Sequence, residues 1–141
     1  MADNVERLLS GIRQMMATGE PPWDYFADDF VWDMSGDETW LERAEYVGRA
    51  GVREFIAEWR ETWDDWQMGV DEAMALSEGV TILVMHQSGR VRGSNVPVEM
   101  RFAQVWVGED GMAKRMIMCR DKEHALEEAR PYLASRTPTR D

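Results

Sequence analysis

The sequence predicts an α+β protein in which helices come first and an antiparallel sheet follows. Two observations carry this prediction. Apolar residues of the first half recur at helical spacing, whereas the second half, from residue 66 on, consists of strand-length apolar or alternating runs. Short turn signals ("SEG", "GSN" and "GEDG") separate these runs, and such short gaps join antiparallel neighbours. The helices are therefore expected to pack on one face of the sheet.

The first half is expected to hold two long helices and one short strand. The first helical stripe ends where Gly19 caps it, and it consists of Val5, Leu8, Leu9, Ile12, Met15 and Met16. Residues 21–29 are expected to add a short helix, residues 30–34 a strand and residues 35–48 a long loop. The strongest helix spans 49–63, with an apolar stripe of Val52, Phe55, Ile56, Trp59 and Trp63.

The second half is expected to form four strands and a closing helix. The strand-like runs cover 66–76, 80–93, 96–107 and 112–120. The closing helix is expected over 121–133, with Asp121 capping its first turn. These elements make one domain over residues 1–135, followed by a polar tail at 136–141.

Composition and charge disfavour several classes of function. The net charge of −11 argues against nucleic acid and anionic membranes as partners, because both attract basic faces. Cys119 is the only cysteine, and His86 and His124 lie too far apart for zinc-type spacing, so we expect no metal and no cofactor. The N-terminus has no secretory pattern and no apolar run approaches membrane-spanning length, so a soluble cytoplasmic protein is expected.

Three segments, taken in order, resemble one known superfamily. "FADDFVWDMSG" (26–36) is similar to its passage from helix to strand, "YVGRAGVREFIAEW" (46–59) to its glycine turn and long helix, and "GEDGMAKRMIMCRDKEHALEEA" (108–129) to its last hairpin, strand and helix. The chain thus resembles the nuclear transport factor two-like superfamily, and within it the SnoaL-like group, from Val5 to Leu133. The resemblance implies a cone-shaped fold, in which a strongly curved antiparallel sheet wraps around helices and leaves a pocket. It does not imply a function, because this fold carries enzymes, binding modules and dimerisation domains.

Asp33 is the candidate catalytic carboxylate. In ketosteroid isomerases of this superfamily, a carboxylate at the matching place of "VxD" is the general base, and the resemblance implies this role for Asp33. A base works there because an apolar wall raises the pKa of the carboxyl group. The alternative is a residue at the strand end that bonds to the following loop or pairs with an arginine.

The partner groups of known enzymes in this superfamily do not occur at the matching positions. Ketosteroid isomerases place a hydrogen-bond donor on the penultimate strand, where counting back from the "GEDG" turn gives Ala103. Limonene epoxide hydrolases use charged groups that would fall near Met85, Gln87 and Met118. We therefore expect neither of these two mechanisms.

Strand alternation predicts which side chains line the pocket. We take odd positions of 96–107 and even positions of 112–120 as inward. Arg101 is then the main polar candidate in the pocket. The predicted lining consists of Phe55, Trp59, Trp63, Met85, Gln87, Ala103, Met116 and Met118. Methionine and aromatic side chains suit a flat apolar or aromatic small molecule. The alternatives are that these residues pack together as core, and that Arg101 forms a structural salt bridge or points into solvent.

The same alternation puts Phe102, Gln104 and Trp106 on the outer face of the sheet. Exposed aromatic side chains on that face predict a homodimer that forms through the sheet.

Two classes of function remain open. One is a cofactor-free isomerase, cyclase or dehydratase, in which Asp33 moves a proton of an apolar carbonyl or polycyclic substrate and Arg101 stabilises the oxyanion. The other is a non-catalytic ligand-binding or dimerisation domain of the same fold.

Overall fold

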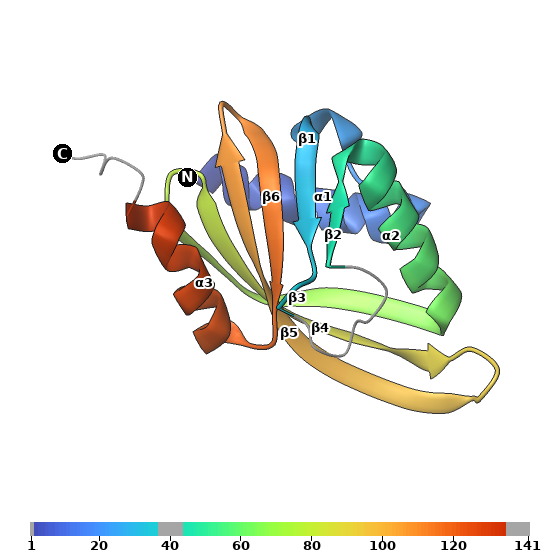
Figure 1. Cartoon of the computed structure of the whole chain (residues 1–141). Helices are drawn as coiled ribbons and strands as arrows, with labels where there is room; N and C mark the ends of the chain where they lie inside the picture. The colour runs from blue at the N-terminus through green and yellow to red at the C-terminus, as the bar shows by residue number, and fades with distance from the viewer. Residues whose placement is uncertain (1, 37–43, 135–141) are drawn as a thin grey trace.

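A computed structural model describes residues 2–36 and 44–134 of the chain. The elements follow in the order α1 (Ala2–Thr18), a short 3₁₀ helix η1 (Trp23–Tyr25), β1 (Phe26–Asp33), β2 (Glu45–Val47), α2 (Gly48–Thr62), β3 (Trp63–Ser77), β4 (Val80–Val91), β5 (Val96–Glu109), β6 (Met112–Cys119) and α3 (Lys122–Ala134). The described part is α+β, with α1, α2 and α3 around one curved sheet of six strands that does not close (Figure 1). This confirms the predicted fold class. None of the described helices has the length and apolar character that a membrane crossing requires.

The ends of the first and last helices follow their sequence signals. Gly19 takes a positive φ of 82°, and its N–H donates to the carbonyl of Met15 at 2.7 Å, which closes α1 as predicted. At α3, the carboxylate of Asp121 accepts the backbone N–H of His124 at 2.8 Å. This hydrogen bond confirms the predicted cap.

The segment between α1 and α2 differs from its prediction. The helix expected over 21–29 is only η1, and β1 already begins at Phe26, whose backbone is extended. Phe26, Phe30 and Trp32 are all buried on the same side, so the aromatic residues form a strand face instead of a helix face. The predicted loop over 35–48 ends in strand β2, and its residues 37–43 lie outside the described residues. The predicted tail at 136–141 lies outside them too.

The sheet order is β2-β1-β6-β5-β4-β3. The β3–β4, β4–β5 and β5–β6 neighbours pair antiparallel, as their short turns predicted, but β1 and β6 pair parallel. The expectation of a purely antiparallel sheet was therefore wrong at this one pair. No hairpin joins β1 to β6, because α2 and four strands separate them in the chain, so the turn signals carry no information on their direction.

Each face of the sheet packs against its own helices. We call the side covered by α1 and α2 the inner face, where Leu8, Val52 and Phe55 join one core with Met85 and Met116. We call the opposite side the outer face, where α3 covers a second core of Val80, Ile82, Ala103, Val105, Val107, Ile117, Cys119, Ala125 and Ala129. The prediction that the helices pack on one face was thus wrong for α3. The small side chains of α3 let it lie closely on the outer face.

Candidate functional site

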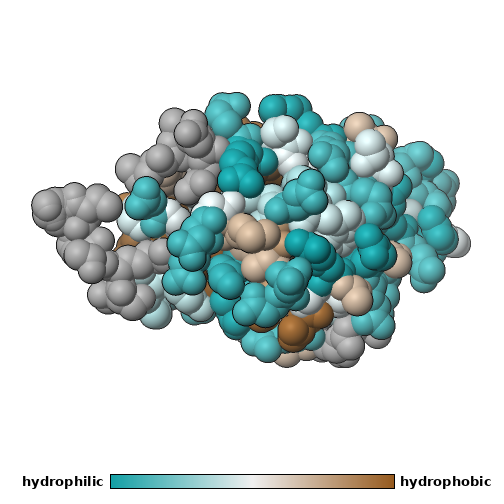
Figure 2. Space-filling view, turned by 90° about the horizontal axis from the view of Figure 1, so that it is seen from above, coloured by the Kyte–Doolittle hydropathy of each residue, from teal (hydrophilic) through white to brown (hydrophobic). Residues whose placement is uncertain are grey.

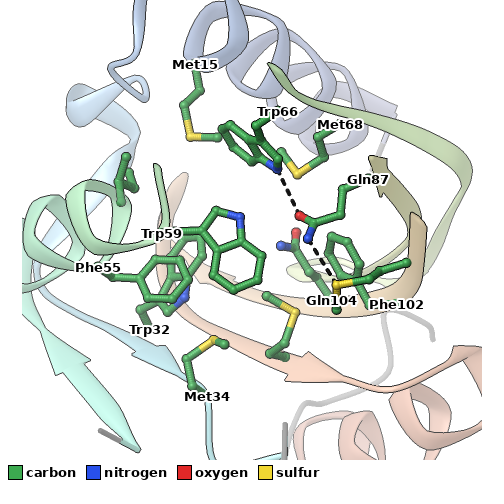
Figure 3. Close-up of a pocket in the computed structure, with 13 residues that line it drawn as sticks. Met15, Trp32, Met34, Phe55, Trp59, Trp66, Met68, Gln87, Phe102 and Gln104 are labelled. Carbon is green, nitrogen blue, oxygen red and sulfur yellow. Dashed lines mark hydrogen bonds between the residues drawn. The ribbon is translucent and has the colours of Figure 1, made fainter. Parts of the chain in front are cut away.

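The inner face holds a partly open cavity of about 60 Å³ between α1, α2 and the sheet. Figure 3 shows its walls, which come from both helices and from five strands. The lining consists of Met15, Trp32, Met34, Phe55, Ile56, Trp59, Trp66, Met68, Gln87, Met100, Phe102, Gln104 and Met118. Methionine and aromatic side chains dominate this lining, and Gln87 and Gln104 are its two amides.

Three aromatic rings form one continuous wall of the cavity. Phe55 and Trp59 lie one turn apart on α2, and their rings stack with centroids 5.9 Å apart and planes 19° apart. Trp32 on β1 continues the wall, since its ring lies 4.9 Å from that of Phe55. The helical stripe predicted from the sequence therefore does place Phe55 and Trp59 at the cavity.

The two amides of the lining lie on neighbouring strands. The side-chain oxygen of Gln87 on β4 accepts the indole N–H of Trp66 at 3.0 Å, and its amide nitrogen donates to the sulfur of Met100 at 3.3 Å (Figure 3). The side-chain oxygen of Gln104 on β5 accepts the indole N–H of Trp106 at 2.9 Å. Both glutamines are buried, so these hydrogen bonds fix the orientation of their amides.

The predicted direction of the β5 side chains was wrong by one residue. Met85 on β4 lies opposite Phe102, so the even positions of β5 face inward, and Phe102 and Gln104 line the cavity. Ala103 is buried on the outer face, and Arg101 is exposed to solvent there. The physical reason is the cost of burying a charge, because the odd positions include Arg101 and Glu99. Those two charges were the signal in the sequence that should have decided the direction.

The other predicted lining residues fall into two sets. Four of them do line the cavity: Phe55, Trp59, Gln87 and Met118. Three are buried in the core without lining it: Trp63, whose ring lies 5.7 Å from that of Trp59, and the fully buried Met85 and Met116.

Asp33 points away from the cavity. Its neighbours Trp32 and Met34 line the cavity, so alternation along β1 turns Asp33 to the outer face, where it is 6% exposed. One carboxylate oxygen accepts the N–H and the hydroxyl of Ser35, at 2.9 and 2.6 Å. The other accepts the guanidinium of Arg115 at 2.6 Å, and Arg115 also pairs with Glu45 at 3.0 Å. These are the contacts expected for a structural residue at the strand end.

The hydrogen bonds of Asp33 also set its charge state. Burial alone would raise the pKa of the carboxyl group, but the hydrogen bonds from Ser35 and Arg115 outweigh it and hold the pKa below its ordinary value. A general base at neutral pH requires the opposite shift. On the same face, burial raises the pKa of the Cys119 thiol to about 12, so this thiol is protonated at neutral pH.

The structure does not bring Asp33 and Arg101 together at the cavity. Asp33 pairs with Arg115, and Arg101 lies in solvent. The sequence predicts Ala103 as the inward residue that replaces the hydrogen-bond donor of ketosteroid isomerases. This prediction loses its basis, because Ala103 does not face inward. Among the described residues, the cavity is lined by no Asp, Glu, His, Lys, Arg, Cys or Tyr side chain, and no cluster of potential metal ligands occurs.

The predicted aromatic patch on the outer face is not there. Phe102 and Gln104 line the cavity, and Trp106 packs into the inner core. The large apolar side chains exposed in the described part are Val47, Val96 and Leu126, which belong to three different elements. The face seen in Figure 2 is mostly hydrophilic, with only scattered apolar residues. The homodimer stays a prediction, without the patch on which it was based.

Comparison with known families and structures gives one family and a consistent fold. The SnoaL-like domain family matches residues 13–116. A comparison with curated proteins gives no match. The chain is similar to a nuclear transport factor two-like protein of unknown function from Burkholderia pseudomallei, with 17% identity, a TM-score of 0.72 and coverage of 92% of this chain and 97% of that one.

Two further solved structures support the same fold. A nuclear transport factor two-like protein from Anabaena variabilis has 18% identity and a TM-score of 0.67, over 87% of this chain and 93% of that one. TerC, co-crystallised with polyporic acid, has 17% identity and a TM-score of 0.68, over 89% of this chain and 95% of that one. At such identities the likeness establishes the fold alone.

Proposed function

The chain belongs to the SnoaL-like domain family, and on that premise we propose that it binds a small, flat, largely apolar molecule in the cavity of the inner face. The observation that carries this proposal is the lining itself. Its described side chains are methionine, isoleucine and aromatic residues with two amides, and none of them is titratable in the neutral range. Such a surface recognises shape and apolar area instead of charge.

The empty space is small, so binding requires side chains to move. A cavity of about 60 Å³ is less than half of the roughly 150 Å³ that holds benzene in an engineered protein cavity. Met34, Met100 and Met118 lie in the wall, and unbranched methionine side chains change conformation at low cost. We therefore expect the cavity to widen around its ligand.

The expected affinity follows from the buried area. A ring-sized ligand buries on the order of 150 Å² of apolar surface, which at about 25 cal/mol per Å² gives roughly 4 kcal/mol. That free energy corresponds to a Kd of about 1 mM. A larger fused-ring molecule would bind more tightly.

The geometry favours binding over the catalytic alternative. Proton transfer by Asp33 with Arg101 as oxyanion partner would need both side chains at the cavity, and both lie on the outer face. A cofactor-free isomerase, cyclase or dehydratase would have to use a base other than the described lining residues. The co-crystallisation of TerC with polyporic acid supports the view that this fold accommodates a small organic molecule.

The test is a titration of the protein with indane, a flat fused-ring hydrocarbon, followed by calorimetry. Met118→Trp should abolish binding, because the indole fills the cavity. Met74→Trp is the matched control, since Met74 packs on the outer face, and it should leave the Kd unchanged. Absence of saturable binding to the wild type, or an equal loss in both variants, would refute the proposed function.

A further inference from the structure

The two amides of the cavity differ in how fully they are hydrogen-bonded. Both ends of Gln87 are engaged, its oxygen with Trp66 at 3.0 Å and its nitrogen with Met100 at 3.3 Å. One of the two N–H groups of the Gln87 amide is therefore already engaged with Met100.

Gln104 is engaged at only one end. An indole N–H can only donate, so the bond from Trp106 at 2.9 Å must reach the carbonyl oxygen of the Gln104 amide. The amide nitrogen consequently points away from Trp106, and it forms no hydrogen bond with another residue in the described part of the chain. The residue is only 4% exposed and lines the cavity. Gln104 thus presents an unpaired donor at the cavity wall.

A second unpaired donor lies in the same wall. The indole nitrogen of Trp32 is fully buried and has no hydrogen-bond partner among the described residues. It belongs to the ring that packs against Phe55, and Figure 3 shows both rings beside Trp59. Both unpaired polar groups of the wall are therefore donors.

Unpaired buried donors select for a ligand that accepts hydrogen bonds. A ketone oxygen pairs with the Gln104 amide, whereas a hydrocarbon leaves this amide unsatisfied. A hydroxyl oxygen also accepts from this amide, but its own O–H then needs an acceptor, and each amide oxygen of the wall already accepts one indole N–H. The empty space of about 60 Å³ is large enough for a water molecule, so the hydrogen bond of a ligand oxygen has to be as good as the one that a water would accept from this amide.

We infer that Gln104 makes the cavity selective for flat aromatic molecules that carry an acceptor oxygen, such as aromatic ketones, over the matching hydrocarbons. This inference rests on the proposed function, because it concerns a ligand of the same cavity. It assigns a specificity-determining role to Gln104, while Gln87 serves to hold Trp66 and Met100 in place.

The test compares 1-indanone with indane, two molecules of nearly the same shape. In a cavity that offers no donor to the ketone oxygen, 1-indanone should bind more weakly than indane, because the ketone loses its hydrogen bonds to water on entering. We expect the wild type to bind 1-indanone at least as tightly as indane. Gln104→Met should change the ratio of the two Kd values by about tenfold in favour of indane, the effect of losing one hydrogen bond.

Gln87→Met is the matched control, because it makes the same substitution at the other amide of the wall. It should leave the ratio of the two Kd values within about threefold of the wild type, since its amide is already engaged. A direct readout avoids dependence on variant folding. In the wild type, 1-indanone should move the amide proton signals of Gln104 downfield, the direction of a new hydrogen bond, whereas indane should give only the shift caused by a nearby aromatic ring.

The outcomes separate the two proposals. If both ligands bind, the ratio of the two Kd values is the same in Gln104→Met and the wild type, and the Gln104 amide signals respond to both ligands alike, the inference is wrong and the proposed function stands. If neither ligand binds, the proposed function is wrong and the inference falls with it.

Discussion

The two faces of the sheet differ in the polar groups that they bury. The outer face pairs its buried charge: Asp33 shares the guanidinium of Arg115 with Glu45, at 2.6 and 3.0 Å. The inner face carries no charge in its described cavity lining, and its polar groups are two neutral amides. One step along a strand separates the two environments, as Trp32 and Asp33 show on β1. The charged network and the apolar cavity therefore lie on opposite sides of the sheet.

This comparison also explains why Asp33 resembles a catalytic base in the sequence without occupying the place of one. A carboxylate beside buried aromatic residues is expected to have a raised pKa. Here the aromatic residues point inward and the carboxylate points outward to Arg115, so the pKa of Asp33 falls instead. Sequence neighbours on a strand do not share an environment.

Replacing Arg115 should give the largest effect on the outer face. Arg115→Met leaves Asp33 buried without its cation, and we expect the free energy of unfolding to fall by about 2–3 kcal/mol, less than for a fully buried pair because Arg115 is partly exposed. Urea unfolding measures this loss. Lys114→Met, which removes the exposed pair with Asp29, is the control and should change stability by less than about 0.5 kcal/mol. Equal losses in the two variants would show that the outer network is no more important than a surface pair.

Shortening a side chain of the cavity wall should give the next largest effect, and it acts on the inner face. Met118→Ala is expected to lower the free energy of unfolding by about 2 kcal/mol, since Met118 is 8% exposed and already borders empty space. The enlarged cavity should also bind indane more tightly, which calorimetry measures. The control is Met74→Ala on the outer face, which should leave the Kd for indane unchanged. A drop in indane affinity in Met118→Ala would contradict the proposed position of the ligand.

Neutralising Asp33 should give a smaller effect, and one that depends on pH. Because the pKa of Asp33 is lowered in the folded state, its contribution to stability is present above the unfolded pKa of about 3.9 and is lost as the pH falls through the lower folded pKa. Asp33→Asn should therefore cost about 1–1.5 kcal/mol at neutral pH and much less in acid. Unfolding curves at several pH values test this, and the Kd for indane should not change.

The smallest effect is expected for Arg101. Because Arg101 is exposed on the outer face, Arg101→Met should change the free energy of unfolding by less than about 0.5 kcal/mol and should leave ligand binding as it is. Thermal unfolding in the presence and absence of 1-indanone measures both quantities. If binding were lost selectively in this variant, the assignment of Arg101 to the outer face would be wrong.

Periodicity predicted most of the fold, because each long element has a repeated local signal. The stripe of α2 and the turns between β3 and β6 are such signals, and both were confirmed except for Trp63, the last residue of the predicted stripe, which begins β3. The parallel pairing of β1 with β6 has no local signal, since these strands meet only through the complete fold. The position of α3 on the outer face likewise depends on the complete fold and has no local signal.

The site was less predictable, because its composition depends on the direction of each strand. The inward direction of Met118 on β6 was predicted correctly, whereas β5 was assigned the wrong face, which exchanged Arg101 and Ala103 for Phe102 and Gln104. An error of one residue reverses every side chain of a strand. Weighing the charges of Glu99 and Arg101 against burial would have corrected it.

The most direct test of the central claim uses the methionine methyl groups as probes of the two faces. On titration with indane, the methyl signals of Met34, Met100 and Met118, which line the cavity, should shift with one common Kd. The signal of Met74, which packs on the outer face, should stay in place. Shifts confined to Met74, or no shift at the cavity methionines up to the solubility of indane, would contradict the claim that the inner face is a ligand-binding site.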